Sequence, residues 1–223
     1  MTQILDAEVL AIITLTLRMT ILSTAISSVI GVPLGLWLDR ASFAGKRLVV
    51  MINRTLMASP PVVVGLVVYL ILMRNGPLGF LRLLFTFEAM VIAQVLLITP
   101  IVCGIVYTAS QRSSERIRVF ALTMGADKRQ TRSLQIKELS NEIFFAVITG
   151  YGRAMSEVGA IMIVGGNIRH HTRTMTTTLS LLRNRGEIEQ AVFLGAILML
   201  IAFSVQMIAD FLRKRERRAD ENF

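Results

Sequence analysis

The chain has 223 residues, of which 53% are hydrophobic and only 17% are charged, and its mean hydropathy is +0.61. This balance excludes an ordinary soluble domain, because the apolar residues fall in long blocks of the length that a membrane-spanning helix needs. The formal net charge of +9 does not favour a nucleic-acid-binding protein. Most basic residues lie between and after the apolar blocks, where they orient a chain in a membrane.

The N-terminal part predicts one membrane anchor. Residues 1–18 have no basic leader, so we expect an interfacial lead-in rather than a cleaved signal peptide. Residues 19–38 are uncharged and predict the first of about five spans. A short basic loop, residues 39–47, is expected to follow. A single transmembrane domain is expected over residues 19–212.

The second predicted span, residues 50–73, is interrupted by Ser59, Pro60 and Pro61. Two consecutive prolines remove two backbone donors and kink or break a helix. In a membrane such a break must be buried in protein or line a water-filled cavity. We therefore assign these three residues to a gate or translocation path.

A polar island, residues 111–140, follows the loop 74–88 and the third predicted span, residues 89–110. It holds seven Lys or Arg residues and three Asp or Glu residues. Ser113 and Ser114 are residue types that cap helix N-termini, so a new helix is expected over residues 114–125.

The apolar face of this predicted helix is formed at i, i+3, i+4 and i+7 by Ile117, Phe120, Ala121 and Met124. Gly125, followed by Ala126, is expected to end the helix, and Asp127 to cap a second, basic helix. A short helix with such a face and no core of its own favours docking to another protein. The alternative is a helix lying on the surface of the bilayer.

The fourth predicted span, residues 143–164, contains Arg153 and Glu157. Ionisable residues inside a membrane are costly and face a cavity or a partner charge, and the i, i+4 spacing allows the two to pair. The pair either pins this helix against its neighbours or forms a polar part of a gate, and both interpretations stay open. Ser156 and Asn167 are assigned to the same path.

The fifth predicted span, residues 190–212, precedes a basic tail, residues 213–223. The loop 39–47, the island 111–140 and this tail together hold fifteen of the 24 Lys and Arg residues. The positive-inside rule then predicts an extracytoplasmic N-terminus and a cytoplasmic C-terminus. The four arginines of the loop 165–189 oppose this assignment.

Other motifs argue against catalysis by this chain. The only Gly-Lys pair, Gly45-Lys46, is followed by Arg, so there is no phosphate-binding loop, and ATP hydrolysis is expected in a partner subunit. The adjacent His170 and His171 are expected in a solvated loop, and no metal or cofactor site is expected. Cys103 is the only cysteine.

Two stretches resemble the tungstate and molybdate permeases of ABC importers. The segment from Gly152 to Gly159, with the following Ile161 to Ile168, closely resembles the corresponding span of that group, and Ala58 to Gly65 resembles its proline-containing second span. The resemblance covers nearly the whole chain. It implies an all-α bundle of the type I ABC importer permease fold, a cytoplasmic coupling helix, a homodimer, two cytoplasmic ATPase subunits and an extracytoplasmic oxyanion-binding protein.

The cytoplasmic loop departs from the pattern of that family, which is Glu-Ala-Ala, three residues, Gly and a later Leu-Pro. Only Ala121 and Gly125 match, and Lys137-Glu138 stands at the place of Leu-Pro. We nevertheless interpret the chain as an inner-membrane permease for tungstate or a related oxyanion such as molybdate or sulfate. Its coupling residues would be Ile117, Phe120, Ala121, Met124, Gly125 and Ala126. The alternative is a pore or secondary carrier that works without an ATPase.

Overall fold

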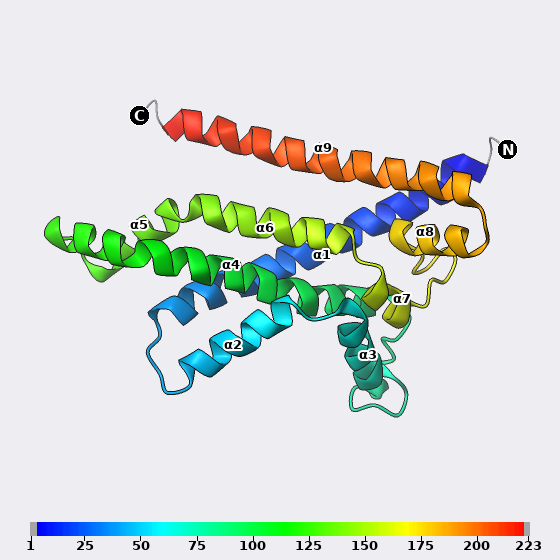
Figure 1. Ribbon diagram of the computed structural model, residues 1–223, viewed down its shortest axis with the longest axis horizontal. Helices are drawn as coiled ribbons and strands as arrows, with labels where there is room; N and C mark the ends of the chain where they lie inside the picture. Colours follow the sequence, from blue (N-terminus) through cyan, green and yellow to red (C-terminus); the bar gives the residue numbers. More distant parts are fainter. Residues whose placement is uncertain (1–3, 221–223) are drawn as a thin grey trace.

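The computed structural model describes residues 4–220, with no account of the side chains of residues 4–7, 114–116, 118, 122 and 212–220. Within that part the chain is helical and contains no strand (Figure 1). The elements are α1 (Ile4–Arg40), α2 (Lys46–Met57), α3 (Pro61–Leu72), the 3₁₀ turn η1 (Gly79–Leu81), α4 (Phe87–Thr123), α5 (Lys128–Glu138), α6 (Ser140–Met155), α7 (Gly159–Gly165), α8 (Met175–Asn184) and α9 (Ile188–Asp220). The all-α fold class is confirmed.

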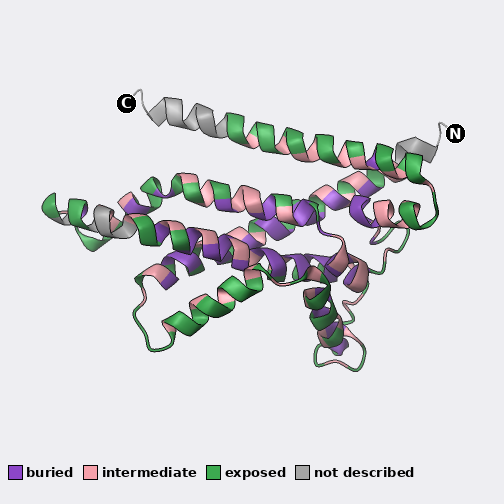
Figure 2. Ribbon diagram, in the orientation of Figure 1, coloured by how far each residue is buried: buried purple, intermediate pink, exposed green. Residues whose placement is uncertain are grey.

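Three helices of the described part, α1, α4 and α9, are long and apolar enough to cross a membrane. The number rises to four if α2 and α3, which meet at an angle of 104°, form one broken span. The prediction of about five spans therefore remains a prediction. Figure 2 shows that α4 is largely buried by its neighbours, whereas α9 is mostly exposed.

Helix α1 joins three segments that the sequence analysis separated. The predicted lead-in and the predicted first span are one helix of 37 residues, and Arg18 points outward from it without interrupting it. The helix also continues through Asp39 and Arg40, which were expected in a loop. Helical hydrogen bonding extends past the apolar block because neither charged residue type breaks a helix.

Helix α4 likewise continues where a new helix was expected to begin. The predicted N-cap at Ser113 or Ser114 is wrong, because α4 runs unbroken from Phe87 to Thr123. The Ser113 hydroxyl donates to the Ala109 carbonyl at 3.2 Å, a back-bond that is compatible with a helix interior. The predicted helix 114–125 is thus the last part of α4.

The fourth predicted span is not one helix. Helix α6 ends at Met155 and α7 begins at Gly159, so the chain leaves the helical path at residues 156–158. This differs from the continuous span that the hydropathy of residues 143–164 predicts.

The buried core lies where α1, α3, α4 and α7 meet. Its largest fully buried side chains include Met19 on α1, Val68 on α3, Met90 on α4 and Ile161 on α7. A second cluster joins α4 to α1 and α6 around Ile98 and Val102. Helices α1 and α4 both contribute to the two clusters, so the other helices are positioned against this pair.

The two ends of the bundle differ in what they carry. The C-terminal ends of α1, α4 and α9 lie at one end of the molecule, with α5 (Figure 1). The start of α1 and helix α8 lie at the other end. The three segments that were expected to share one side of the membrane therefore lie at the same end of the bundle.

Candidate functional site

The first helix break lies between α2 and α3 and is caused by Pro60 and Pro61. Pro60 is extended, with φ −63° and ψ 129°, and Pro61 is the first residue of α3, where its missing N–H costs nothing. The Ser59 hydroxyl donates to the Leu56 carbonyl at 2.7 Å, which satisfies one acceptor at the end of α2. The predicted interruption of the second span is present, and it turns the chain by 104°.

The second break, between α6 and α7, is organised by Glu157, whose side chain is 3% exposed. Its Oε1 accepts a hydrogen bond from the backbone N–H of Ala160 at 3.0 Å, so the carboxylate caps the N-terminus of α7, where negative charge is favourable. Its backbone carbonyl accepts from the Thr176 hydroxyl at 2.8 Å. Glu157 therefore ties the break to the start of α8.

Arg153 is a secondary partner of Glu157. Its Nη2 lies 3.6 Å from Glu157 Oε2, and its side chain is 36% exposed, which is typical of a weak pair. Ser156, which follows the last residue of α6, donates its hydroxyl to the Arg153 carbonyl at 3.1 Å. The pair is not part of one continuous helix face, as the sequence analysis assumed, because Glu157 stands beyond the end of α6.

The two breaks are brought together by the packing of α3 against α7. A Cβ atom at Gly65 would lie 2.7 Å from Ala160 Cα, so only glycine allows the two backbones to approach this closely. At the same level, a Cβ atom at Gly159 would lie 3.6 Å from the backbone nitrogen of Val62. The N-terminal ends of α3 and α7 are therefore neighbours, and each follows directly on a break.

Gln94 is a residue of this region that the sequence analysis missed. It is fully buried on α4, accepts a hydrogen bond from the Ser23 hydroxyl at 2.5 Å and donates one to the Ala154 carbonyl at 2.9 Å. It thus joins α1 to the last turn of α6, next to the second break. A single amide in an apolar stretch gives little sequence signal, because its partners lie 71 and 60 residues away.

Asn167 lies apart from the two breaks. It follows Gly166 at the C-terminal end of α7 and has a positive φ of 51°, while Glu157 caps the opposite end of that helix. The structure therefore brings together the breaks at residues 58–60 and 156–158, but not Asn167.

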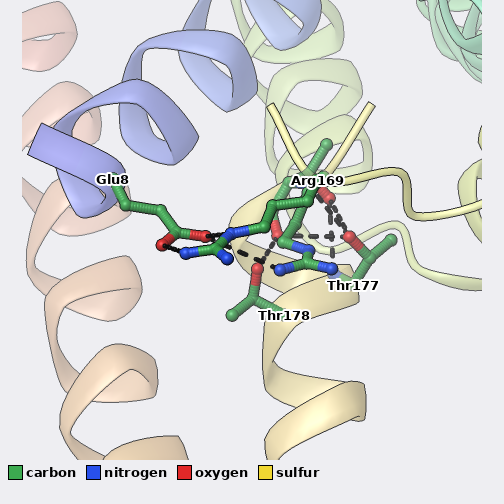
Figure 3. Close-up of polar contacts among 6 residues, drawn as sticks. Glu8, Arg169, Thr177 and Thr178 are labelled. Atoms are coloured by element: carbon green, nitrogen blue, oxygen red, sulfur yellow. Dashed lines mark hydrogen bonds and ion pairs between the residues drawn. The ribbon is translucent and has the colours of Figure 1, made fainter. Parts of the chain in front are cut away.

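The loop that follows α7 is fastened to α1. Arg169 forms a bidentate ion pair with Glu8, with Nε–Oε1 at 2.9 Å and Nη2–Oε2 at 2.6 Å (Figure 3). This hydrogen bonding raises the pKa of the Arg169 guanidinium. The backbone N–H of Met175 donates to the Thr16 hydroxyl at 2.9 Å. The basic loop 165–189 thus has an acidic partner on α1 that the charge count alone did not reveal.

A hollow of about 690 Å³ opens beside the C-terminal half of α4. It reaches from Met57, next to the first break, to polar residues near the start of α6. Its lining consists of Met57, Gly104, Ile105, Thr108, Ala109, Arg112, Asn141, Glu142, Phe145 and Asp210.

The last turns of α4 project beyond the bundle together with α5 (Figure 1). Phe120 is 55% exposed and Met124 is 71% exposed, whereas Ala121 is buried and Ile117 is half-buried. The predicted apolar face is thus only partly covered by this chain. We call the projecting segment, residues 117–138, the arm.

The turn at the tip of the arm has the predicted form. Gly125 has a φ of +73°, which a residue with a side chain adopts only at a cost, and the Ala126 N–H donates to the Ala121 carbonyl at 2.9 Å. Asp127 caps α5 and forms a capping box with Gln130. The predicted end of one helix and the predicted cap of the next are confirmed.

Comparison with known proteins gives a consistent result. The tungstate uptake system permease protein TupB of Peptoclostridium acidaminophilum is 42% identical over 203 residues, which cover 91% of this chain and 89% of that protein. TupB of Campylobacter jejuni is 35% identical over 172 residues, 77% of this chain and 72% of that protein. The molybdenum transport system permease protein ModB of Azotobacter vinelandii is 29% identical over 204 residues, 88% of this chain and 90% of that protein.

The family described as "Binding-protein-dependent transport system inner membrane component" matches residues 31–218. This range contains both helix breaks and the whole arm. The family is one of transport components rather than enzymes, and the long apolar helices agree with a membrane location. The chain therefore belongs to the family of binding-protein-dependent transport system inner membrane components.

Proposed function

We propose that this chain is the permease subunit of an ATP-driven importer for tungstate or a related tetrahedral oxyanion, molybdate or sulfate. The relatives named for tungstate and molybdate support this substrate class, and a relative named for sulfate, CysW of Escherichia coli, widens it. The observation that carries the proposal is the projecting arm, whose exposed Phe120 and Met124 offer an apolar surface to a partner.

That partner is an ABC-type ATPase in the cytoplasm. The chain has no phosphate-binding loop, so the energy of ATP must come from another subunit. The docking segment contains Ile117, Phe120, Ala121, Met124, Gly125 and Ala126, of which Ala121 is buried and would support the exposed residues rather than contact the partner. A protein that contacts Phe120 and Met124 would cover apolar side chains that this chain leaves exposed, and such anchors contribute strongly to binding.

The membrane orientation follows from the end of the bundle that carries the arm. With the loop 39–47, the island 111–140 and the tail in the cytoplasm, the positive-inside rule is obeyed by fifteen of the 24 Lys and Arg residues. The N-terminus then lies outside and the C-terminus inside. The contact between Glu8 and Arg169 removes part of the objection raised by the basic outer loop, because the charge of Arg169 is paired with a carboxylate there.

The gate lies at the two neighbouring helix breaks. Broken helices in a membrane occur where the backbone is buried in protein or faces a cavity, and the hollow next to Met57 lies on the cytoplasmic side of the first break. Pro60, Pro61, Ser156 and Glu157 form the core of this gate, with Ser59 and Arg153 beside it. ATP-driven motion of the arm would switch the side from which the path is open.

Two further partners belong to the proposal. A second copy of this chain would complete the translocation path as a homodimer, and an extracytoplasmic protein would deliver the oxyanion near the loops 74–88 and 165–189. Selectivity among tungstate, molybdate and sulfate would lie mainly in that binding protein.

The test is the tungsten and molybdenum content of cells with and without this chain at nanomolar supplied oxyanion. We expect tungsten uptake to depend on the chain and on a co-purifying ATPase subunit. Uptake that persists in vesicles containing this chain but no ATPase would contradict the proposal and favour a self-contained carrier.

A further inference from the structure

The arm is joined to α1 by a partly buried network of hydrogen-bonded polar side chains. Gln135 on α5 is 6% exposed and Ser110 on α4 is 0% exposed, and between them and the end of α1 stand Asp39 and Arg40. The sequence analysis gave none of these four residues a role. Ser110 precedes the arm on α4, and Gln135 lies within the arm on α5.

The hydrogen bonds of this four-residue network run in one direction, from Arg40 to Asp39. Arg40 donates to Gln135 Oε1 from Nε at 3.1 Å and from Nη2 at 2.7 Å. The Gln135 amide nitrogen donates to the Ser110 hydroxyl at 2.9 Å, and that hydroxyl donates to Asp39 Oδ2 at 2.7 Å. The reverse orientation of the amide would place its NH₂ group against the guanidinium donors of Arg40, so the direction is fixed by chemistry.

Gln135 is the only residue of α5 that is buried. All other side chains of that helix are exposed or half-buried, so α5 has no apolar core of its own. Leu139, which follows α5, is buried in the same cluster as Leu36 of α1. Within α5 itself the link to α1 is the polar connection at Gln135, which is strong only while every member is paired. Replacement of Gln135 by an apolar residue would leave Ser110 and Arg40 without these bonds.

We infer that Gln135 is a positioning residue that transmits the displacement of the docked arm to the C-terminal end of α1. This inference rests on the proposed function, because it presumes an ATPase that moves the arm. Helix α5 follows the turn at Gly125 directly, and α1 runs the length of the bundle to Glu8 and the outer loop. A rigid link at Gln135 converts motion at the tip of the arm into motion of a helix that contacts both ends of the path.

The test compares Gln135→Met, which keeps the length of the side chain and removes all three hydrogen bonds, with Gln135→Glu, which keeps an acceptor for Arg40 but loses the donor to Ser110. Lys137→Met is the matched control, because Lys137 is exposed on the same helix. Each permease is reconstituted in proteoliposomes with its ATPase subunit and its binding protein. Complex assembly, ATP hydrolysis and the tungstate transported per ATP are then measured.

We expect all variants to assemble and hydrolyse ATP. The tungstate transported per ATP should fall at least about fivefold in Gln135→Met, the lower end of typical coupling energies. It should fall less in Gln135→Glu, which keeps the bonds from Arg40, and stay near the wild-type value in Lys137→Met. Unchanged transport per ATP in Gln135→Met, or a parallel loss of assembly, hydrolysis and transport, would overturn the inference. A wild-type complex that hydrolyses ATP but moves no oxyanion would instead remove the proposed function, and the inference with it.

Discussion

The carboxylate of Glu157 caps helix α7 by accepting a hydrogen bond from the backbone N–H of Ala160 at 3.0 Å. This contact gives Glu157 a partner that does not depend on Arg153. Glu157→Gln keeps an oxygen at that position, whereas Glu157→Leu leaves a buried donor unpaired at a cost of about 1–3 kcal/mol. We expect thermal unfolding of the purified permease to show a lower Tm for Glu157→Leu only. Equal Tm values for the two variants would argue against the capping role.

The close approach of α3 and α7 predicts that Gly65 cannot be enlarged. A Cβ atom at this position would lie 2.7 Å from Ala160 Cα, so Gly65→Ala should destabilise the protein by about 1–3 kcal/mol through overpacking. Gly152→Ala is the control, because a Cβ atom there meets nothing within 4 Å and alanine favours a helix. Thermal unfolding in detergent checks this prediction, and it fails if both alanine variants unfold at the wild-type temperature.

The amide of Gln94 joins α1 to α6, so its removal should be costly. Gln94→Leu removes the donor to the Ala154 carbonyl and the acceptor for Ser23, with an expected loss of about 1–3 kcal/mol. Gln111→Leu changes the same residue type at an exposed position of the same helix and should have little effect on stability. The unfolding temperatures of the two variants test this prediction. An equal fall in Tm for Gln94→Leu and Gln111→Leu would mean that the hydrogen bonds of Gln94 do not stabilise the protein.

The docking role of the arm predicts that Gly125→Asp uncouples ATP hydrolysis from transport. A Cβ atom at Gly125 would meet nothing within 4 Å, so the protein should still fold and insert. The aspartate would, however, place a negative charge on the apolar docking surface. Gly45→Asp is the matched control, since Gly45 also has a positive φ, of 96°, with nothing within 4 Å of its Cβ position. It carries the same backbone strain but lies outside the arm.

Uptake of tungstate and hydrolysis of ATP are measured together for these two glycine variants. We expect coupled transport in Gly45→Asp and hydrolysis without transport in Gly125→Asp. Wild-type uptake by Gly125→Asp would count against docking at this turn.

The features that the sequence predicted correctly were encoded by residues with strong local preferences. Pro60 and Pro61 cannot continue a helix, Gly125 is suited to a left-handed turn, and Asp127 with Gln130 forms a capping box. In each case the relevant contacts lie within a few residues of each other in the chain.

The missed features depend on tertiary contacts. Residues 156–158 contain no glycine or proline, and the break there is held in part by the Thr176 hydroxyl, 19 residues away from Glu157. At Ser113 the error was the reverse: a helix start was predicted, but α4 continues through this position. Residues 105–124 contain no glycine or proline that would stop α4. Gln94 and Gln135 gave no pattern at all, because their partners come from distant segments.

The position of Phe120 tests the central claim that the arm is a cytoplasmic docking site for an ATPase. Cys103, the only native cysteine, is buried, so Phe120→Cys and Phe80→Cys each introduce one accessible thiol at side chains that are 55% and 74% exposed. In intact cells that contain the assembled transporter, a membrane-impermeant thiol reagent should label Phe80→Cys and not Phe120→Cys. A thiol crosslinker applied to broken membranes should join Phe120→Cys to the ATPase. Labelling of Phe120→Cys from outside, or no crosslink to any other subunit, would contradict the account.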